Sequence, residues 1–418
     1  MIVRSFSFLL RLLLFTLCFS LLAMYGLKAQ QDLPNKSSSQ DEEKVKVGIS
    51  GYIQGLVAIG QKNATSTVGT STKEQDGMFM RMGIRRGYLT TKASYKALSA
   101  VTQLLVTDKS LGIFQAYLRY NPTMHPEHRL TFGLTTVPFG YELVISSRDL
   151  ESFERAAYYS DLFPTIIDMG IYYHYSPSFS IQHAINFFTL DLGLLSGNST
   201  FGMRKALPDI IGRIVFGHKD SKMKRLYGVS GYYGYTTAVG KQYARRIYLG
   251  THLDYQLHLT DGDLKFRLET LGGWQSGTPQ TNCAVGSNSP EKKGAEQFVL
   301  LERPFLGAMG MLVYKSKRLP IEGFVKYDYY NRNLNLKQRL ASPSIHQDLH
   351  YKAEGVSHRG TIGLNSYFFK NRLRLSAHYE LNAQEGGYYA NPSDPLSPLQ
   401  TFWIPQNDLF LLGAQFIF

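Results

Sequence analysis

Seven basic side chains are spaced in a way that could bind oxyanions. Each stands in a stretch where polar and apolar residues alternate, and each falls on the polar side. They are Arg119, Arg129, Arg213, Arg267, Lys326, Arg372 and Arg374. The guanidinium fork of Arg can donate two hydrogen bonds to one oxyanion, whereas Lys acts as a point charge. Acids share these polar sides, so ion pairs between the two sets are an equally open interpretation. They are Asp254, Glu269, Glu322, Asp328 and Glu380.

Catalytic and metal-binding patterns are weaker. Ser230, Ser376 and His378 could supply a nucleophile and a base, but their spacing is not typical of a hydrolase. His252 and His258 are too far apart on an extended strand to share one metal ion. The sequence therefore predicts no catalytic residues, no metal and no cofactor.

The polar and apolar sides belong to predicted β-strands, in which successive side chains point to opposite faces. In residues 247–257 the odd positions are Ile, Leu, Thr, Leu, Tyr and Leu, while the even positions include His, Asp and Gln. An Asp-Gly turn then leads into residues 264–269, where Leu, Phe and Leu alternate with Lys, Arg and Glu, which predicts a hairpin. A soluble sandwich would bury the apolar face, whereas a membrane barrel turns it to lipid and lines its lumen with the charges.

The lengths of the connections decide between these two folds. Outer-membrane barrels alternate short periplasmic turns with longer outer loops. Short turns are expected near Lys96, His125, Ser178, Asp220, Gly262, Lys317 and Asn371. Long polar connections fall between them, so we expect an all-β fold, a transmembrane antiparallel β-barrel of about sixteen strands. The predicted strands are 47–58, 78–91, 97–107, 112–121, 128–136, 166–177, 180–191, 209–218, 224–236, 244–258, 263–273, 304–315, 319–331, 357–369, 372–382 and 408–418.

The start of the chain has the pattern of a signal peptide over residues 1–29. Arg4 and Arg11 precede an apolar run, which is shorter than a spanning helix, and Ala29 ends the segment. Its removal takes away three cations and no acids, which lowers the net charge from +13 to +10. Cys283 would then be the only cysteine, which excludes an internal disulfide. Residues 30–45 form a polar leader, and residues 46–418 form the predicted barrel.

The last ten residues place Phe410, Leu412, Ala414, Phe416 and Phe418 on one face of an extended strand. The chain ends on an aromatic residue, as in the C-terminal strand signal by which bacterial outer-membrane barrels are recognised for assembly. This favours the outer membrane of a Gram-negative bacterium. The positive charge is spread over many alternating strands, and this excludes the basic patch of a nucleic-acid-binding protein.

Three stretches resemble the phosphate-selective porin O and P family. They are IRRGYL at Ile84–Leu89, FQAYLRY at Phe114–Tyr120 and GLTTVPFGYELVISSRDLESFERA at Gly133–Ala156. Weaker similarity to the same family continues through most of the remaining chain. The resemblance implies a sixteen-stranded, trimeric porin whose third outer loop, Pro138 to Pro164, folds into the lumen and narrows it.

The resemblance also implies an anion site at the constriction, with Arg85 and Arg86 matching the paired arginines of the family. Regular alternation lets only one of them face the lumen and favours Arg85, whereas a bulge would turn both inward. The other expected residues of the constriction are Asp108, Arg148 and Arg155. The family usually has an Asp where this chain has Gln115, and Asp108 lies close by in sequence. The acids of the loop, Glu142, Asp149, Glu151 and Glu154, are expected to pair partly within the loop and to hold it against the wall.

Together these patterns predict a porin in outer-membrane lipid. It would form a homotrimer and pass small anions, with phosphate or other oxyanions as favoured solutes, down their gradient through basic lumen residues. Two alternatives stay open at this stage. One is a general porin without selectivity, and the other is a closed barrel whose outer loops act as a binding or adhesin surface.

Overall fold

The computed structural model describes residues 44–69, 77–178, 185–197, 208–237, 243–277, 301–335, 355–385 and 403–418. Residues Val45 to Phe418 form one compact unit. The predicted signal peptide, nearly all of the predicted leader and Cys283 lie outside the described residues.

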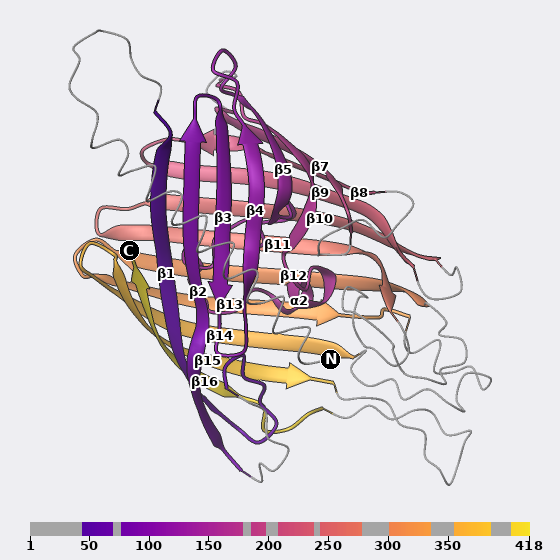
Figure 1. The fold of residues 1–418 in the computed structure, drawn as a ribbon. Coiled ribbons are helices and arrows are strands. Elements are labelled where there is room, and N and C mark those ends of the chain that lie inside the picture. Colours follow the sequence, from indigo (N-terminus) through magenta and orange to yellow (C-terminus); the bar gives the residue numbers. More distant parts are fainter. Residues whose placement is uncertain are drawn as a thin grey trace, which may run out of the picture. The chain divides into compact units, whose positions relative to one another are not determined.

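Sixteen antiparallel strands form one closed barrel, in which each strand pairs with its sequence neighbours and β1 closes the ring against β16 (Figure 1). The predicted fold class is therefore confirmed. The strands are β1 Lys46–Gly60, β2 Phe79–Tyr95, β3 Leu98–Val106, β4 Leu111–Tyr120, β5 His128–Thr136, β6 Ile167–Tyr175, β7 Phe187–Leu195, β8 Asp209–Lys219, β9 Met223–Thr237, β10 Tyr243–His258, β11 Gly262–Gly277, β12 Leu301–Ser316, β13 Ile321–Asn331, β14 Val356–Phe368, β15 Leu373–Gln384 and β16 Leu409–Ile417.

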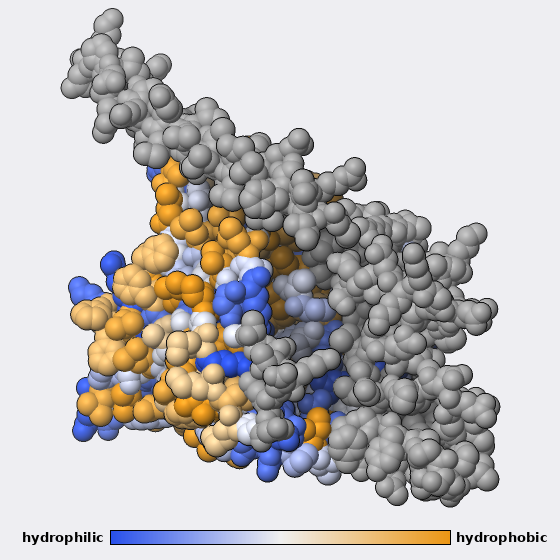
Figure 2. Space-filling view, turned by 60° about the horizontal axis from the view of Figure 1, so that its bottom comes forward, coloured by the Kyte–Doolittle hydropathy of each residue, from blue (hydrophilic) through white to orange (hydrophobic). Residues whose placement is uncertain are grey.

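The outer surface of the barrel is apolar and its inner surface is polar in many places. In β13 the inward side chains of Lys326 and Asp328 are buried, whereas the outward Val325 and Tyr327 are 52% and 50% exposed. The same alternation runs round the ring and produces the apolar outer surface seen in Figure 2. Apolar side chains outside and charges inside are the arrangement that a strand needs when lipid lies on one side and water on the other. No helix in the described residues is both long and apolar enough to cross a membrane.

One predicted strand overlaps the observed strand only in part. The sequence predicts a strand at 180–191 after a short turn near Ser178, whereas β7 runs from Phe187 to Leu195, and residues 179–184 lie outside the described residues. The residues before Phe187 continue the alternation of apolar and polar types, so the pattern alone does not show where the strand begins. The remaining fifteen predicted strands overlap the observed ones.

Two irregularities interrupt the regular pairing. Opposite β1, the register shifts between Gln54 and Gly55, which pair with Arg86 and Ile84, so that Arg85 is the additional residue of a β-bulge in β2. A second shift opposite Gln103 leaves one additional residue in β4. The first bulge changes which side chains of β2 can reach the lumen.

Candidate functional site

Loop 3 joins β5 to β6 at residues 137–166 and lies inside the barrel, where it carries the short helix α2 (Ala157–Leu162) (Figure 1). Many of its apolar side chains belong to one buried cluster with residues of the wall. From the loop these are Val137, Phe139, Leu143, Ala156, Tyr158, Tyr159, Leu162 and Phe163, and from the wall they include Tyr172, Tyr232, Tyr248, Phe305, Met309 and Tyr330. Because the loop has a core of its own, it forms a packed partition inside the lumen.

A glycine of the wall makes room for one of the loop's rings. A Cβ on Gly307 of β12 would lie 2.7 Å from the ring of Tyr158. Real carbon contacts are not that short, so a larger side chain at this position would displace the ring. The close approach of loop to wall therefore depends on the absence of a side chain here.

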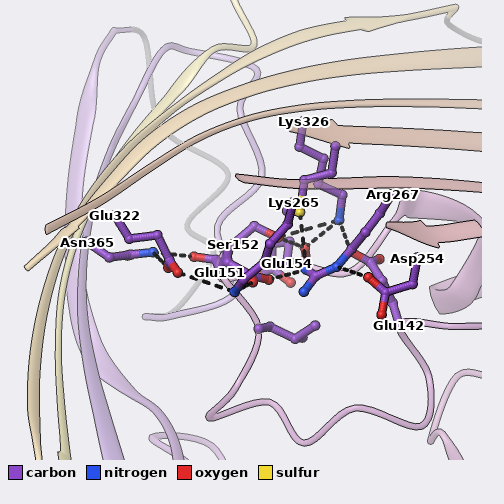
Figure 3. Close-up of polar contacts among 12 residues, drawn as sticks. Glu142, Glu151, Ser152, Glu154, Asp254, Lys265, Arg267, Glu322, Lys326 and Asn365 are labelled. Atoms are coloured by element: carbon purple, nitrogen blue, oxygen red, sulfur yellow. Dashed lines mark hydrogen bonds and ion pairs between the residues drawn. The ribbon is translucent and has the colours of Figure 1, made fainter. Parts of the chain in front are cut away.

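Ion pairs hold loop 3 to β11 and β13 (Figure 3). Lys326 Nζ lies 2.5 Å from Glu142, and Arg267 Nη1 and Lys265 Nζ lie 2.5 and 3.1 Å from Glu151. None of these five side chains is more than 17% exposed. Glu142 and Glu151 therefore form their ion pairs with cations of the wall, and not with cations of the loop itself.

Glu154 forms a third such attachment, with Arg85 of β2. Arg85 donates from Nε at 3.0 Å and from Nη2 at 2.6 Å to the two carboxylate oxygens, and its side chain is 3% exposed. Burial alone would raise the pKa of Glu154, but Arg85 and Arg86 lower it to about 2. Arg85, expected at the anion site, is therefore occupied by a carboxylate of the loop.

Arg86 also reaches the loop, because the bulge in β2 places both neighbouring arginines on the lumen side. Arg86 donates to the hydroxyl of Ser147, and Arg155 Nη1 lies 3.3 Å from the same oxygen. Arg155 also donates to the carbonyl oxygens of Glu142 at 2.9 Å and Ile145 at 2.8 Å. Within the described residues neither Arg86 nor Arg155 forms an ion pair, so two like charges converge on one neutral hydroxyl.

Three other expected site residues lie elsewhere. Asp108 is exposed in the connection between β3 and β4, where it accepts a hydrogen bond from Gly69 N at 2.6 Å. Arg148 is 47% exposed and contacts its neighbour Asp149 at 3.3 Å. Arg372 is exposed in the turn before β15, because the strand begins one residue later than predicted. The structure therefore places Arg372 at the rim of the barrel and not on the lumen wall.

The predicted lumen-lining residues divide into two groups. Arg267 and Lys326 hold acids of loop 3, and Arg374 donates to the carbonyl oxygen of Leu150 at 2.7 Å. These belong to β10–β16, which we call the covered wall. Arg119, Arg129 and Arg213 lie on the other side of the lumen, on β4–β8, which we call the open wall.

A cavity of about 350 Å³ lies between loop 3 and part of the open wall. Its lining includes Gln115, Tyr117, Arg119, Arg129, Thr131, Thr135, Thr136, Pro138, Val144, Tyr172, His174, Asp191 and Arg213. On β5 alone it touches residues from Arg129 near the turn end to Thr136 near the loop end. A strand advances by about 3.3 Å per residue, so these seven steps cover roughly 23 Å. The cavity is therefore elongated along the barrel wall.

Positive charge dominates this cavity. Arg119 donates to the hydroxyl of Tyr117 at 3.2 Å and lies over its ring at 4.8 Å from the ring centre, and neither Arg119 nor Arg129 forms an ion pair with any described residue. Asp191 is the one carboxylate among the described residues of the lining. It lies 3.2 Å from Arg213 and 2.6 Å from His174. Apart from His174, the three arginines and one aspartate of the described lining leave two net positive charges.

Sequence reasoning missed several residues of the cavity, namely Tyr117, Thr131, His174 and Asp191. Alternation could have placed them on the lumen side, since Tyr117 shares its face with Arg119, and Thr131 shares its face with Arg129. Their proximity depends on the pairing of neighbouring strands. His174 lies opposite both Arg129 and Asp191, and Asp191 lies opposite Arg213. Charged or aromatic residue types alone would not reveal this row.

No known family profile matches the sequence, and no curated protein sequence matches it. Solved structures do match. The outer membrane channel DcaP of Acinetobacter baumannii is 14% identical, with a TM-score of 0.54, covering 92% of this chain and 100% of that one. An anion-selective porin from Comamonas acidovorans is 12% identical, with a TM-score of 0.54, covering 90% and 100%. The trimer form of OmpT, an outer membrane protein of Vibrio cholerae, is 11% identical, with a TM-score of 0.50, covering 90% and 99%. The chain therefore has the barrel fold of outer-membrane porins.

Proposed function

We propose that this protein is an outer-membrane porin through which small anions diffuse passively, and that the cavity beside loop 3 is the passage. Its fold is that of channel proteins, and its apolar exterior suits lipid. Loop 3 obstructs the side of the covered wall. The elongated cavity leaves space along the open wall.

The observation that carries the anion preference is the pairing difference between the two walls. On the covered wall, Arg267 and Lys326 are neutralised by acids of loop 3. On the open wall, Arg119 and Arg129 form no ion pair with any described residue, and Asp191, which acts on Arg129 from a distance, is itself ion-paired with Arg213. Unpaired cations in a narrow, low-dielectric passage raise the local concentration of anions and repel cations.

Phosphate or another oxyanion is the narrower part of this proposal. It is supported by the resemblance of the arginine-pair region and by the convergence of Arg86 and Arg155 on Ser147. Two guanidinium groups without a carboxylate partner could share one oxyanion. Arg85 would contribute indirectly, by holding Glu154 and with it the loop.

The direct test is the reversal potential of the purified protein in a planar bilayer under a potassium chloride gradient. We expect wild type to be anion-selective, and the double substitution Arg119→Gln with Arg129→Gln to lose most of the selectivity. Arg372→Gln is the matched control, because it removes an exposed arginine at the same end of the barrel. Phosphate added to the chamber should reduce the chloride current, and Arg86→Gln should weaken that effect.

Other outcomes would point to the alternatives. Large currents without ion preference would identify a general porin, and the absence of channels from a correctly folded barrel would favour a binding or adhesin protein. A trimer is also part of the proposal, since one structural neighbour is described in a trimer form. Chemical cross-linking in native membranes would test it, with a ladder ending at three subunits as the expected result.

A further inference from the structure

We infer that the passage favours organic carboxylates with a planar, aromatic body over inorganic oxyanions. This inference rests on the proposed function and names the class of solute for its passage. It follows from the shape of the cavity, from the order of side chains along it and from the geometry of Arg119.

The size of the cavity is the first argument. A volume of about 350 Å³ lies within the range of pockets that hold small organic molecules. One water molecule takes roughly 30 Å³, so a single inorganic oxyanion would leave most of this space to solvent. An organic anion could fill more of the cavity and contact opposite walls at once.

The lining is mixed in a way that suits an amphipathic solute. Loop 3 contributes the apolar Pro138 and Val144, and the open wall contributes the rings of Tyr117 and Tyr172. Hydroxyl groups and the amide of Gln115 lie toward the loop end, whereas the unpaired arginines lie toward the turn end. Chloride or phosphate would gain nothing from the apolar and aromatic surfaces, because their binding energy comes from charge and hydrogen bonds alone.

Arg119 presents a binding edge for a carboxylate. Its guanidinium lies over the ring of Tyr117 at 4.8 Å, and one terminal nitrogen is 3.2 Å from the hydroxyl of that residue. Its Nε is buried and has no hydrogen-bond partner among the described residues, so a solute in the cavity would meet the terminal nitrogens. A guanidinium can use its two terminal nitrogens together to bind a carboxylate through two parallel hydrogen bonds. The ring of Tyr117 holds the guanidinium plane, so a carboxylate bound at its edge and an aromatic ring coplanar with that carboxylate would take one orientation in the cavity.

Arg129 supplies the second cation. It lies on β5 two residues from Thr131, which pairs directly with Arg119 across the strands, so both arginines face the same part of the passage. Arg129 forms no ion pair with any described residue, whereas Arg213 is ion-paired with Asp191, which also acts on Arg129 from a greater distance. A carboxylate passing Arg119 can therefore transfer to Arg129 without breaking an ion pair between described residues.

The test compares how benzoate, benzamide and inorganic phosphate block the chloride current of the full protein in planar bilayers. Benzamide has the same ring without the charge, and phosphate has charge without the ring. We expect benzoate to half-block the current at a concentration about tenfold below that of phosphate, the ratio that about 1.4 kcal/mol of additional contact would produce. Benzamide should block weakly at any concentration used.

Variants assign the effect to the cavity. Arg119→Gln should raise the half-blocking concentration of benzoate about tenfold, since a bidentate charged hydrogen bond is lost. Arg119→Lys keeps the charge but not the fork, so it should lose the preference for benzoate over phosphate. Arg318→Gln, which changes an exposed arginine in a turn, is the control. Benzoate should block it at the same concentration as wild type. The slower gel migration of unfolded barrels would identify any variant that fails to fold.

The outcomes separate the two proposals. Anion-selective channels on which benzoate acts no better than phosphate would overturn this inference and leave the proposed function standing. Equal loss of benzoate block in Arg119→Gln and in Arg318→Gln would also overturn it, because the effect would not come from the cavity. Channels without anion selectivity would overturn both.

Discussion

The two walls of the lumen carry similar residues and use them differently. On the covered wall, Lys326 and Arg267 are buried against Glu142 and Glu151 of loop 3. On the open wall, Arg119 and Arg129 face a cavity and form no ion pair with any described residue. A cation in a barrel can thus be part of the structure or part of the passage. The path of one loop decides which.

The largest effect is expected when one partner of a buried ion pair on the covered wall is removed. Lys326→Met would leave Glu142 buried without its cation, and such a loss costs about 3–5 kcal/mol. We expect loop 3 to loosen, the free energy of unfolding to fall and single-channel currents to become noisier. Denaturant titration of the folded barrel and single-channel recording would measure both effects.

The control for this change is Arg318→Met. Arg318 and Asp261 form an ion pair at 2.6 Å, but their side chains are 77% and 56% exposed. Exposed pairs contribute at most about 1 kcal/mol. Equal destabilisation by the two substitutions would contradict the view that buried pairs hold the loop.

The next largest effect is expected from filling the space beside Tyr158. Gly307→Val would place a side chain where a Cβ already lies 2.7 Å from the ring, and overpacking of this kind costs about 1–3 kcal/mol. Gly310→Val, three residues along the same strand, is the matched control, because nothing lies within 4 Å of a Cβ there. A rise in conductance for Gly307→Val alone would show that the displaced ring belongs to the partition. Identical conductance and stability in the two variants would argue against the packed loop.

Much of this fold could be predicted from the sequence, because alternation and connection lengths are local patterns. The lumen side of Arg119, Arg129 and Arg213 follows from alternation alone. Whether each of these cations forms an ion pair does not follow from alternation, because this depends on where loop 3 crosses the lumen. Arg372 shows the limit of alternation, since its strand begins one residue after it. The bulge that brings Arg86 to the lumen breaks the same rule, and only the register between β1 and β2 reveals it.

One substitution should neutralise a cation of the open wall, as the acids of loop 3 neutralise cations of the covered wall. Thr131 lies directly opposite Arg119 on the neighbouring strand, at a spacing where opposite charges interact. Thr131→Glu should pair with Arg119 and reduce the anion selectivity severalfold, whereas Thr131→Gln, with the same size and no charge, should change it little. The reversal potential under a salt gradient measures both. If Thr131→Glu kept full selectivity, Arg119 would not be part of the selective passage.

The smallest effect is expected from acid acting on Glu151 and Glu154, two of the acids that attach loop 3 to the wall. Burial alone would raise the pKa of Glu151, but Arg267 and Lys265 lower it from the ordinary 4.5 to about 2, and the pKa of Glu154 is lowered to about 2 as well. An acid whose pKa is lowered in the folded state stabilises the fold at every pH above its ordinary pKa. This contribution is lost as the pH falls toward the folded-state pKa. The ion pairs of Glu151 and Glu154 should therefore hold loop 3 from neutral pH down to about 4.5, and the noise caused by their loss should rise only below it. Glu151→Gln, which cannot titrate, should show the higher noise at every pH. A transition of the wild-type channel near neutral pH would mean that groups other than these two acids control the loop.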